Sequence, residues 1–259
     1  MIQVLKESSQ VHTSIQQLSR MALPLHVTAQ KNWDHKLLVD LLEGVSKETK
    51  ILDLGSGDGF TLTLLHHLGY KQIFGIDYAK PRRSRRETLR RIFRPFKFDP
   101  ANLITIGDIC RTHFPEESFE WMTCISVIEH GVDLAVFFEE VARLLAPGGR
   151  LLITFDYWHD FDSSQTQEIQ IFDLPWKIFN ENSVRKMINL ASEYCLEIAD
   201  SSLCMTKAAR EAKGSVSSGE LKTVRDNHQM TAIPSCQQAT VSYSGFEYTF
   251  MAIVFEKHS

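Results

Sequence analysis

Short apolar runs alternate with helically spaced apolar residues through the middle of the chain. The short runs predict five β-strands, at residues 51–54, 72–76, 103–106, 119–125 and 150–155. Elsewhere apolar residues recur every three or four positions, which predicts amphipathic helices at 33–45, 61–68, 89–96 and 134–145. Strands that alternate with helices form parallel β-α-β units with right-handed crossovers. The pattern therefore predicts an α/β fold built on a parallel sheet.

The N-terminal part of the chain has a weaker pattern. It is polar with scattered apolar positions until the first predicted amphipathic helix. We therefore expect an N-terminal helical extension over residues 1–47 and a single domain over residues 48–259. With 259 residues, of which 43% are apolar, the chain can bury one substantial core.

The pattern changes again after the fifth predicted strand. Residues 157–180 lack clear periodicity, and Asn180 then suits the N-cap of a helix that runs to about Glu193. Two more strands are predicted, at 195–199 and 248–255. Residues 201–245 between them are polar and unpatterned, which is typical of a functional lid or of disorder. We expect 157–180 and 201–245 to be insertions that cover a substrate, the second of them suited to gating.

Composition points to a cytoplasmic location. No stretch approaches the roughly eighteen uninterrupted apolar residues of a membrane span, and residues 1–10 lack the basic and apolar parts of a signal peptide. The five cysteines are odd in number and widely spaced, so we expect reduced thiols rather than a disulfide framework or a zinc knuckle.

Charge is distributed unevenly. The net charge of −4 argues against a nucleic-acid partner, yet residues 80–97 hold nine basic residues against one acid. This segment has three interpretations: a solvated helix face, a weak peripheral contact with an anionic ligand or membrane surface, and an RNA-binding face. The RNA interpretation is the least favoured, because no aromatic residues interleave on the polar side.

A glycine-rich turn follows the first predicted strand. It reads Asp53-Leu54-Gly55-Ser56-Gly57-Asp58-Gly59 and leads into a helix. Glycines accept positive φ and let a ligand approach the backbone, while the free N–H groups of the helix start face an anion. A dinucleotide-binding fingerprint would have Gly or Ala where Phe60 stands, which disfavours a nicotinamide-dependent oxidoreductase.

This turn resembles motif I of the class I S-adenosylmethionine-dependent methyltransferases. The resemblance spans residues 50–156 and includes Ser126-Val127-Ile128-Glu129-His130 and Leu145-Ala146-Pro147-Gly148-Gly149. It is closest to the bacterial small-molecule type, methyltransferase type 11/12-like. It implies a Rossmann-like, doubly wound, seven-stranded sheet, mostly parallel, with the last strand antiparallel and inserted between the fifth and sixth. It also implies the cofactor S-adenosyl-L-methionine, which leaves as S-adenosyl-L-homocysteine.

Acidic residues end three of the predicted strands. The carboxyl ends of parallel strands line one crevice, so Asp53, Asp77 and Asp108 should converge there. Asp77 lies 22 positions after Gly55 and can accept both hydrogen bonds of a ribose diol, whereas Asp108 can accept from the adenine amine. Each acid alone could equally be a solvated turn residue or a helix cap. The resemblance implies a cofactor-binding set of Asp53, Gly55, Ser56, Gly57, Gly59, Asp77, Tyr78, Gly107, Asp108, Ile109, Ser126 and Val127.

Two departures from related families narrow the chemistry. Relatives that methylate quinone precursors have a metal-binding Glu where Ser126 stands, next to a pair like Glu129-His130, so we expect no metal. Methyltransferases that act on base amines carry Pro-Pro-Tyr after the fourth strand, which residues 126–128 do not match.

The expected reaction is an in-line transfer of a methyl group to a small-molecule acceptor. We expect O-methylation of a hydroxyl group, and the candidate acceptors are sugars and other secondary-metabolite-like molecules. Orientation can supply about 7 to 11 kcal/mol, and a general base about 10²- to 10⁴-fold. The candidate bases are His130 and His159, although His130 could instead only fix the start of the following helix. We also predict an aromatic acceptor pocket, formed by Tyr157, Trp158, Trp176 and Phe179. The main alternative is a non-catalytic S-adenosylmethionine-binding or regulatory module on the same fold.

Overall fold

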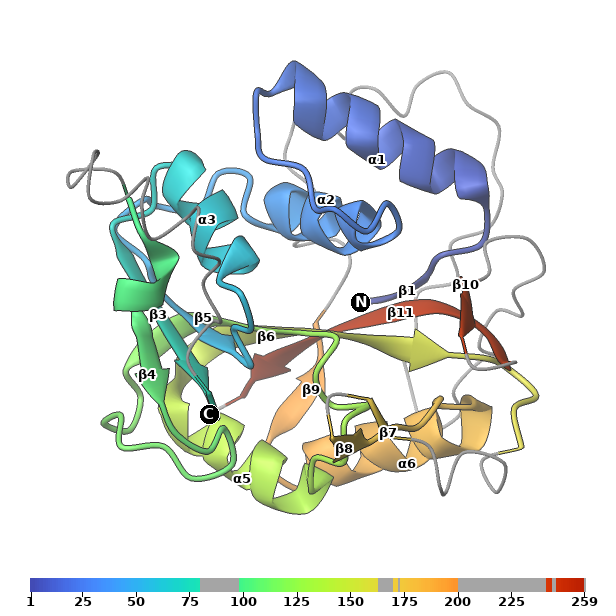
Figure 1. The fold of residues 1–259 in the computed structure, drawn as a ribbon. Coiled ribbons are helices and arrows are strands. Elements are labelled where there is room, and N and C mark those ends of the chain that lie inside the picture. Colours follow the sequence, from blue (N-terminus) through green and yellow to red (C-terminus); the bar gives the residue numbers. More distant parts are fainter. Residues whose placement is uncertain (80–97, 163–169, 172, 200–240, 244–245, 259) are drawn as a thin grey trace, which may run out of the picture.

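The computed structural model describes residues 1–79, 98–162, 170–171, 173–199, 241–243 and 246–258. The cationic segment 80–97 and most of the second predicted insertion, 201–245, lie outside the described residues. The predictions made for them therefore stay predictions. The chain is drawn in Figure 1.

A central sheet runs through the molecule in the order β1-β11-β6-β5-β2-β3-β4 (Figure 1). Five strands are mutually parallel: β2 (Lys50–Leu54), β3 (Gln72–Asp77), β4 (Ile104–Ile106), β5 (Phe119–Ile125) and β6 (Leu145–Tyr157). The last strand, β11 (Phe246–Lys257), is antiparallel and lies between β6 and β9 (Leu196–Ile198). The doubly wound seven-stranded arrangement is thereby confirmed.

Two further strands extend this sheet, and the sequence pattern did not predict either. β1 (Ile2–Val4) pairs antiparallel with β11, beside β9 on the same edge, and β10 (Val241–Tyr243) also pairs with β11. Residues 2–4 are therefore not part of a helical extension, whereas α1 (Ser8–Arg20) is helical as expected. Three residues are too few to show strand periodicity in a sequence.

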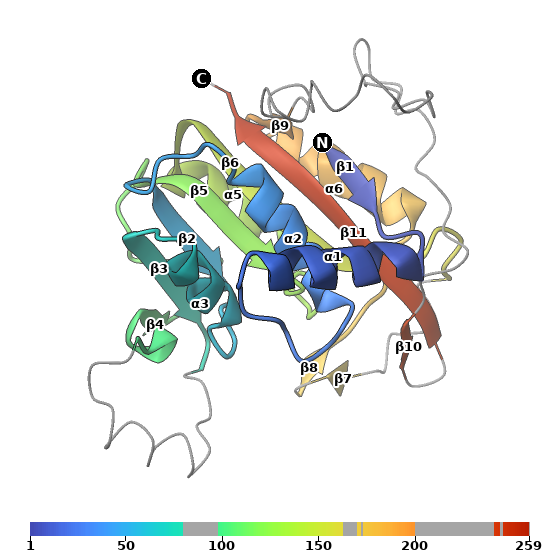
Figure 2. The same cartoon turned by 90° about the horizontal axis from the view of Figure 1, so that it is seen from above.

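Helices cover both faces of the sheet (Figures 1 and 2). One face carries α1, α2 (Lys31–Leu41) and α3 (Phe60–His67). The other carries α5 (Leu134–Leu144) and α6 (Glu181–Ser192). The predicted cap is present at α6, where the Asn180 side chain accepts from the Ser183 N–H at 2.9 Å. A 3₁₀ turn (Pro100–Asn102) and a two-stranded hairpin of β7 (Gln170–Ile171) and β8 (Leu174–Pro175) complete the fold.

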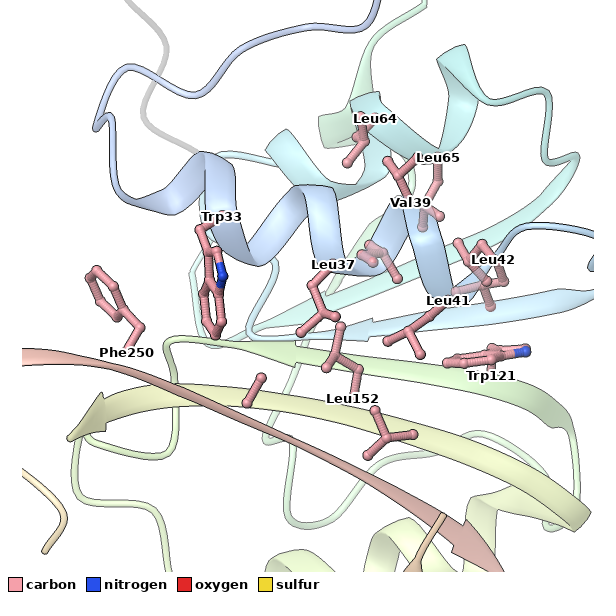
Figure 3. Packing of buried hydrophobic residues seen from close by; sticks show 14 of the residues in the cluster. Trp33, Leu37, Val39, Leu41, Leu42, Leu64, Leu65, Trp121, Leu152 and Phe250 are labelled. Carbon is pink, nitrogen blue, oxygen red and sulfur yellow. The ribbon is translucent and has the colours of Figure 1, made fainter. Parts of the chain in front are cut away.

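Helix α2 is held on the sheet by a row of buried side chains (Figure 3). Trp33, Leu37 and Leu41 lie on its sheet-facing side and are 5–7% exposed. Leu152 of β6 and Phe250 of β11 belong to the same core cluster. Each such side chain stabilises the fold by about 1.5 to 3 kcal/mol on burial. This packing fixes the N-terminal turn of α2 near the carboxyl ends of β5 and β6, where the site lies.

Candidate active site

The glycine-rich turn joins β2 to α3 and is bonded to the neighbouring strand. The N–H groups of Gly55 and Ser56 donate to the Ile76 carbonyl at 2.9 and 3.1 Å. Gly55 has φ +74°, and a Cβ there would overlap the Val127 side chain. Only glycine combines this backbone conformation with so close a neighbour. The turn is therefore a fixed cradle rather than a loose loop.

Asp77, at the end of β3, closes this cradle from the other side. Its carboxylate accepts the Gly57 N–H at 2.8 Å and the Ala79 N–H at 3.1 Å, and the residue is 7% exposed. A Cβ at Gly57 would meet nothing within 4 Å, so the turn is open on the side to which that Cβ would point. Each carboxylate oxygen accepts more than one hydrogen bond, which leaves capacity for the hydroxyls of a ribose. The residues present thus fit the cofactor's ribose.

Asp53 is the buried acid at the end of β2. Thr123 donates its hydroxyl to the Asp53 carboxylate at 2.6 Å, and Ser56 donates its hydroxyl to the Asp53 carbonyl at 2.9 Å. Burial raises the pKa of the Asp53 carboxyl to about 7, against the opposing effect of these hydroxyls. A cationic group bound nearby would favour its ionised form, which is the response needed to hold an ammonium group.

The residues predicted to lie near the adenine follow β3 and β4, at the β4 edge of the sheet. Asp108 is exposed and accepts the Cys110 N–H at 2.8 Å, and Tyr78 is 64% exposed. The Gly107 N–H donates to the Asp77 carbonyl at 2.9 Å, which ties this loop to the cradle. Ile109 is half-buried. Nothing in the structure tests the adenine role, which stays a prediction.

Four charged residues from three parts of the chain meet near the carboxyl ends of β5 and β6. Lys31, at the start of α2, donates to the Ser126 hydroxyl and lies 3.9 Å from the Asp34 carboxylate. Its charge also acts on Glu129, after β5, and on Asp156, at the end of β6. We call Lys31, Asp34, Glu129 and Asp156 the acceptor-side cluster.

The acids of this cluster are buried, and some of their carboxyl oxygens lack a hydrogen-bond partner among the described residues. Asp34 and Glu129 are 0% and 1% exposed. Both Asp34 carboxylate oxygens and Glu129 Oε2 have no hydrogen-bond partner among the residues that the structure describes. Burial raises the pKa of the Asp34 carboxyl to about 7, and raises that of the Glu129 carboxyl well above its ordinary value. A buried polar group without a hydrogen-bond partner lowers the free energy of unfolding by about 1 to 3 kcal/mol.

Asp156 is the better-satisfied acid of the cluster. It accepts the Trp176 indole N–H at 2.8 Å, although burial still raises the pKa of its carboxyl. Trp176 packs on Tyr248, with ring centroids 5.4 Å apart, and the Tyr248 and Phe250 rings are 6.1 Å apart. The Lys31 ammonium lies 4.2 Å from the centre of the Phe250 ring. An aromatic wall therefore borders the cluster.

The prediction that four aromatic residues form one acceptor pocket is wrong. Trp158 and Trp176 pack with the core under α2, whereas Tyr157 and Phe179 pack with the core under α5 and α6. Successive residues of a strand point to opposite faces, so Asp156 and Tyr157 at the end of β6 cannot line the same pocket. Tyr248 and Phe250 of β11 take part in the wall instead.

The two candidate histidines lie in different surroundings. Burial and the Lys31 charge lower the pKa of His130 to about 4, so its imidazole is neutral at neutral pH. His159 has Nδ1 3.0 Å from the Tyr157 hydroxyl and Nε2 3.4 Å from the Glu181 carboxylate. It lines a shallow pocket beside the start of α6, with Asn180 and Arg185. The structure therefore brings His130, and not His159, next to the acceptor-side cluster.

Sequence reasoning missed Lys31 and Asp34 as site residues. The readable signal was that Asp34 precedes Leu38 and Leu41 at i+4 and i+7, which places a charge on the apolar side of an amphipathic helix. No group of three or more His, Cys, Asp or Glu side chains in the described part of the chain could hold a metal ion. Independence from metal stays a prediction.

Comparison with known proteins assigns the central region. Residues 52–153 match the family model described as methyltransferase domain. No curated protein sequence matches the chain. Among the described residues, no helix combines the length and the apolar character that a membrane crossing needs.

Many solved structures share the fold. One is the geranyl diphosphate C-methyltransferase of Streptomyces coelicolor A3(2), solved with Mg²⁺, geranyl diphosphate and S-adenosyl-L-homocysteine; it is 15% identical, with a TM-score of 0.54 over 97% of this chain and 85% of that one. Another is the 1,6-didemethyltoxoflavin-N1-methyltransferase of Burkholderia thailandensis, solved with 1,6-didemethyltoxoflavin and S-adenosylhomocysteine; it is 12% identical, with a TM-score of 0.51 over 86% and 77%. At these identities the likeness shows the fold. The family match assigns residues 52–153 as a methyltransferase domain, and the cradle described above fits the cofactor S-adenosylmethionine.

Proposed function

We propose that the protein transfers the methyl group of S-adenosylmethionine to a hydroxyl of a small polar acceptor. Sugars and related polyols belong to this class of acceptors. The observation that carries the proposal is the acceptor-side cluster, which offers an ammonium donor in Lys31 and, in Glu129, a carboxyl oxygen with no hydrogen-bond partner among the described residues. A hydroxyl both donates and accepts hydrogen bonds, so it satisfies both kinds of group. The neighbouring aromatic wall suits the C–H faces of a sugar ring.

The cofactor residues have separate tasks in this scheme. Asp77 holds the ribose, Asp53 faces the amino group, and the positive end of the helix that starts after Gly59 lies toward the cofactor carboxylate. When bound, the cofactor supplies an electrophilic methyl group on a sulfonium. The protein's own contribution is to orient the acceptor oxygen toward that group and to exclude water, with little covalent work of its own.

A hydroxyl acceptor also loses a proton during transfer. His130 is our first candidate for the base, because its imidazole is neutral at neutral pH and lies near Lys31. His159 remains the second candidate. It can serve only if the acceptor extends to the α6 side, where its ring contacts Tyr157 and Glu181.

The test is a methyl-transfer assay with mass-spectrometric detection. Purified protein and S-adenosylmethionine are incubated with four acceptor classes: neutral sugars and polyols, phenols, amines, and carboxylic acids. We expect product only from hydroxyl-bearing acceptors, with the methyl group on oxygen. Product on nitrogen or carbon would contradict the hydroxyl assignment. Tight S-adenosylhomocysteine binding without product from any class, or from a metabolite extract, would favour the non-catalytic binding module.

A further inference from the structure

The N-terminal turn of α2 places a lysine and an aspartate at the acceptor side of the crevice. We propose that Lys31 binds the acceptor oxygen and that Asp34, one turn later on the same helix, positions Lys31. The proposal rests on the proposed function and assigns residues within that site. Lys31 would be the specificity-determining contact, and Asp34 a positioning residue.

The backbone of Lys31 is firmly anchored. The Lys31 N–H donates to the Thr28 carbonyl at 3.2 Å, and His35 Nδ1 lies 2.6 Å from the Lys31 carbonyl. Next to it, the Asn32 amide is 1% exposed and donates to the carbonyls of His26 and Ala29 at 3.1 and 3.0 Å. A side chain acts with precision when its supporting residues fix its origin. The first turn of α2 meets this condition.

The Ser126 hydroxyl shows what the Lys31 ammonium binds. Ser126 directly follows β5, has φ +54°, and its N–H donates to the Thr154 carbonyl at 2.9 Å. Lys31 donates to its hydroxyl from above the Phe250 ring. The protein's own hydroxyl thus occupies a place that an acceptor oxygen can take. Because the Lys31 side chain is 19% exposed and that of Asp34 is 0%, an entering molecule reaches Lys31 first.

The position of Lys31 relative to the sheet argues against a role in holding the cofactor carboxylate. Its contacts come from the ends of β5 and β11, and its charge acts on Asp156 of β6. The glycine-rich turn follows β2, and β6 and β11 lie beyond β5 from that strand. The positive end of α3, next to the glycine-rich turn, already suits a carboxylate. Lys31 therefore belongs to the acceptor.

The charges around Lys31 explain why Asp34 positions it. The ammonium faces Asp34 on its own helix, Glu129 and His130 after β5, and Asp156 on β6. Of the three acids, Asp34 is the one within 4 Å of the ammonium. A long flexible side chain loses much rotamer freedom when it is held, and a fixed carboxylate beside it offsets part of this loss.

The test compares Lys31→Met with a matched control on the same helix, Lys36→Met, whose ammonium pairs with the exposed Asp40. S-adenosylhomocysteine binding is measured by calorimetry. KM and kcat are measured for the hydroxyl acceptors found in the assay above. We expect Lys31→Met to raise the acceptor KM at least tenfold, with the S-adenosylhomocysteine Kd within twofold of wild type. Lys36→Met should change neither constant.

Further variants separate the two roles. Lys31→Arg keeps a cationic donor and should retain a KM within about threefold of wild type. Asp34→Asn should raise KM by less than Lys31→Met, with the cofactor Kd unchanged. A Lys31→Met protein whose S-adenosylhomocysteine Kd weakens tenfold, or whose acceptor KM is unchanged, overturns the proposal.

The outcomes also separate this proposal from the proposed function. If the accepted class proves to be amines, the hydroxyl assignment fails, and an unchanged amine KM in Lys31→Met then overturns the Lys31 role as well. If no class is methylated, the proposed function fails and calorimetry decides: an unchanged S-adenosylhomocysteine Kd supports placing Lys31 outside the cofactor site, and a weakened one overturns it.

Discussion

Asp77 and Asp34 are both buried acids beside one crevice, yet the protein treats them differently. Asp77 accepts two backbone N–H groups, from the glycine-rich turn and from the end of its own strand. Asp34 accepts none among the described residues, and burial raises the pKa of its carboxyl to about 7. The fold itself satisfies the acid that we assign to the cofactor, whereas Asp34, which we assign to the acceptor side, has no hydrogen-bond partner among the described residues.

This contrast shows where the fold gives up stability. A carboxylate held by backbone donors is pre-organised and adds order to the turn around it. An unmet buried carboxyl destabilises the folded state and persists where function requires it. The same comparison distinguishes two sites: the cofactor site, which many methyltransferases need, and the acceptor site that we propose for this chain.

The largest expected effect is on stability, from Asp34→Asn. A carboxyl whose pKa is raised on folding lowers the free energy of unfolding as pH rises from about 4 to about 7, and the loss persists above pH 7. The variant lacks this loss, so it should be the more stable protein above pH 7, by at most about 4 kcal/mol. Urea unfolding at pH 5, 6, 7 and 8 measures the difference. Asp40→Asn, an exposed acid on the same helix, is the control. A gain that does not grow with pH would contradict the assignment.

Trp176→Phe should make Asp156 resemble Asp34. The substitution removes the indole N–H that the Asp156 carboxylate accepts, at a cost of about 1 to 3 kcal/mol in the free energy of unfolding. The loss should grow as pH rises through the range in which the Asp156 carboxyl ionises, because the hydrogen bond stabilises the ionised form. Trp158→Phe leaves that bond intact. Equal losses in the two variants would show that packing, and not the hydrogen bond, is responsible.

Asp77→Ala tests the cofactor side of the comparison. S-adenosylmethionine binding should weaken at least tenfold, about 1.4 kcal/mol, while the circular-dichroism spectrum is unchanged. Asp58→Ala alters an exposed acid of the same turn, which accepts the Phe60 N–H at 3.0 Å, and should have a much smaller effect. Unchanged affinity of Asp77→Ala by calorimetry would refute the ribose role.

The smallest expected effect is that of a chelator. Because Ser126 stands where a metal ligand would be needed, methyl transfer should proceed at an unchanged rate in EDTA. Complete loss of activity that Mg²⁺ restores would show that Glu129 and His130 serve a metal.

The sequence predicted the cofactor side well. Glycine positions, strand-ending acids and helical periodicity are local signals, and the structure has the predicted parallel strands with β11 inserted beside β6. The acceptor side depends on residues far apart in the chain. Lys31 meets Phe250 only because β11 passes under the start of α2, a tertiary relation that no local pattern encodes.

Errors in the prediction have the same origin. Tyr157 and Trp158 are neighbours in sequence, and their separation to opposite faces follows only once the strand is known to continue to residue 157. β1 was missed because three residues carry no period, and its partner lies at the other end of the chain.

The place of β11 in the sheet also has a consequence for biosynthesis. Ile2 pairs with Ile253, and β11 brings Phe250 to the ammonium of Lys31. Contacts between such distant residues form late, because a long loop must close first, and β11 leaves the ribosome after the strands of the cradle. The strands that carry the cofactor cradle can pair while the chain is still being made. The acceptor side therefore completes only after the last strand has emerged, so a nascent chain can acquire a place for S-adenosylmethionine before it can hold an acceptor.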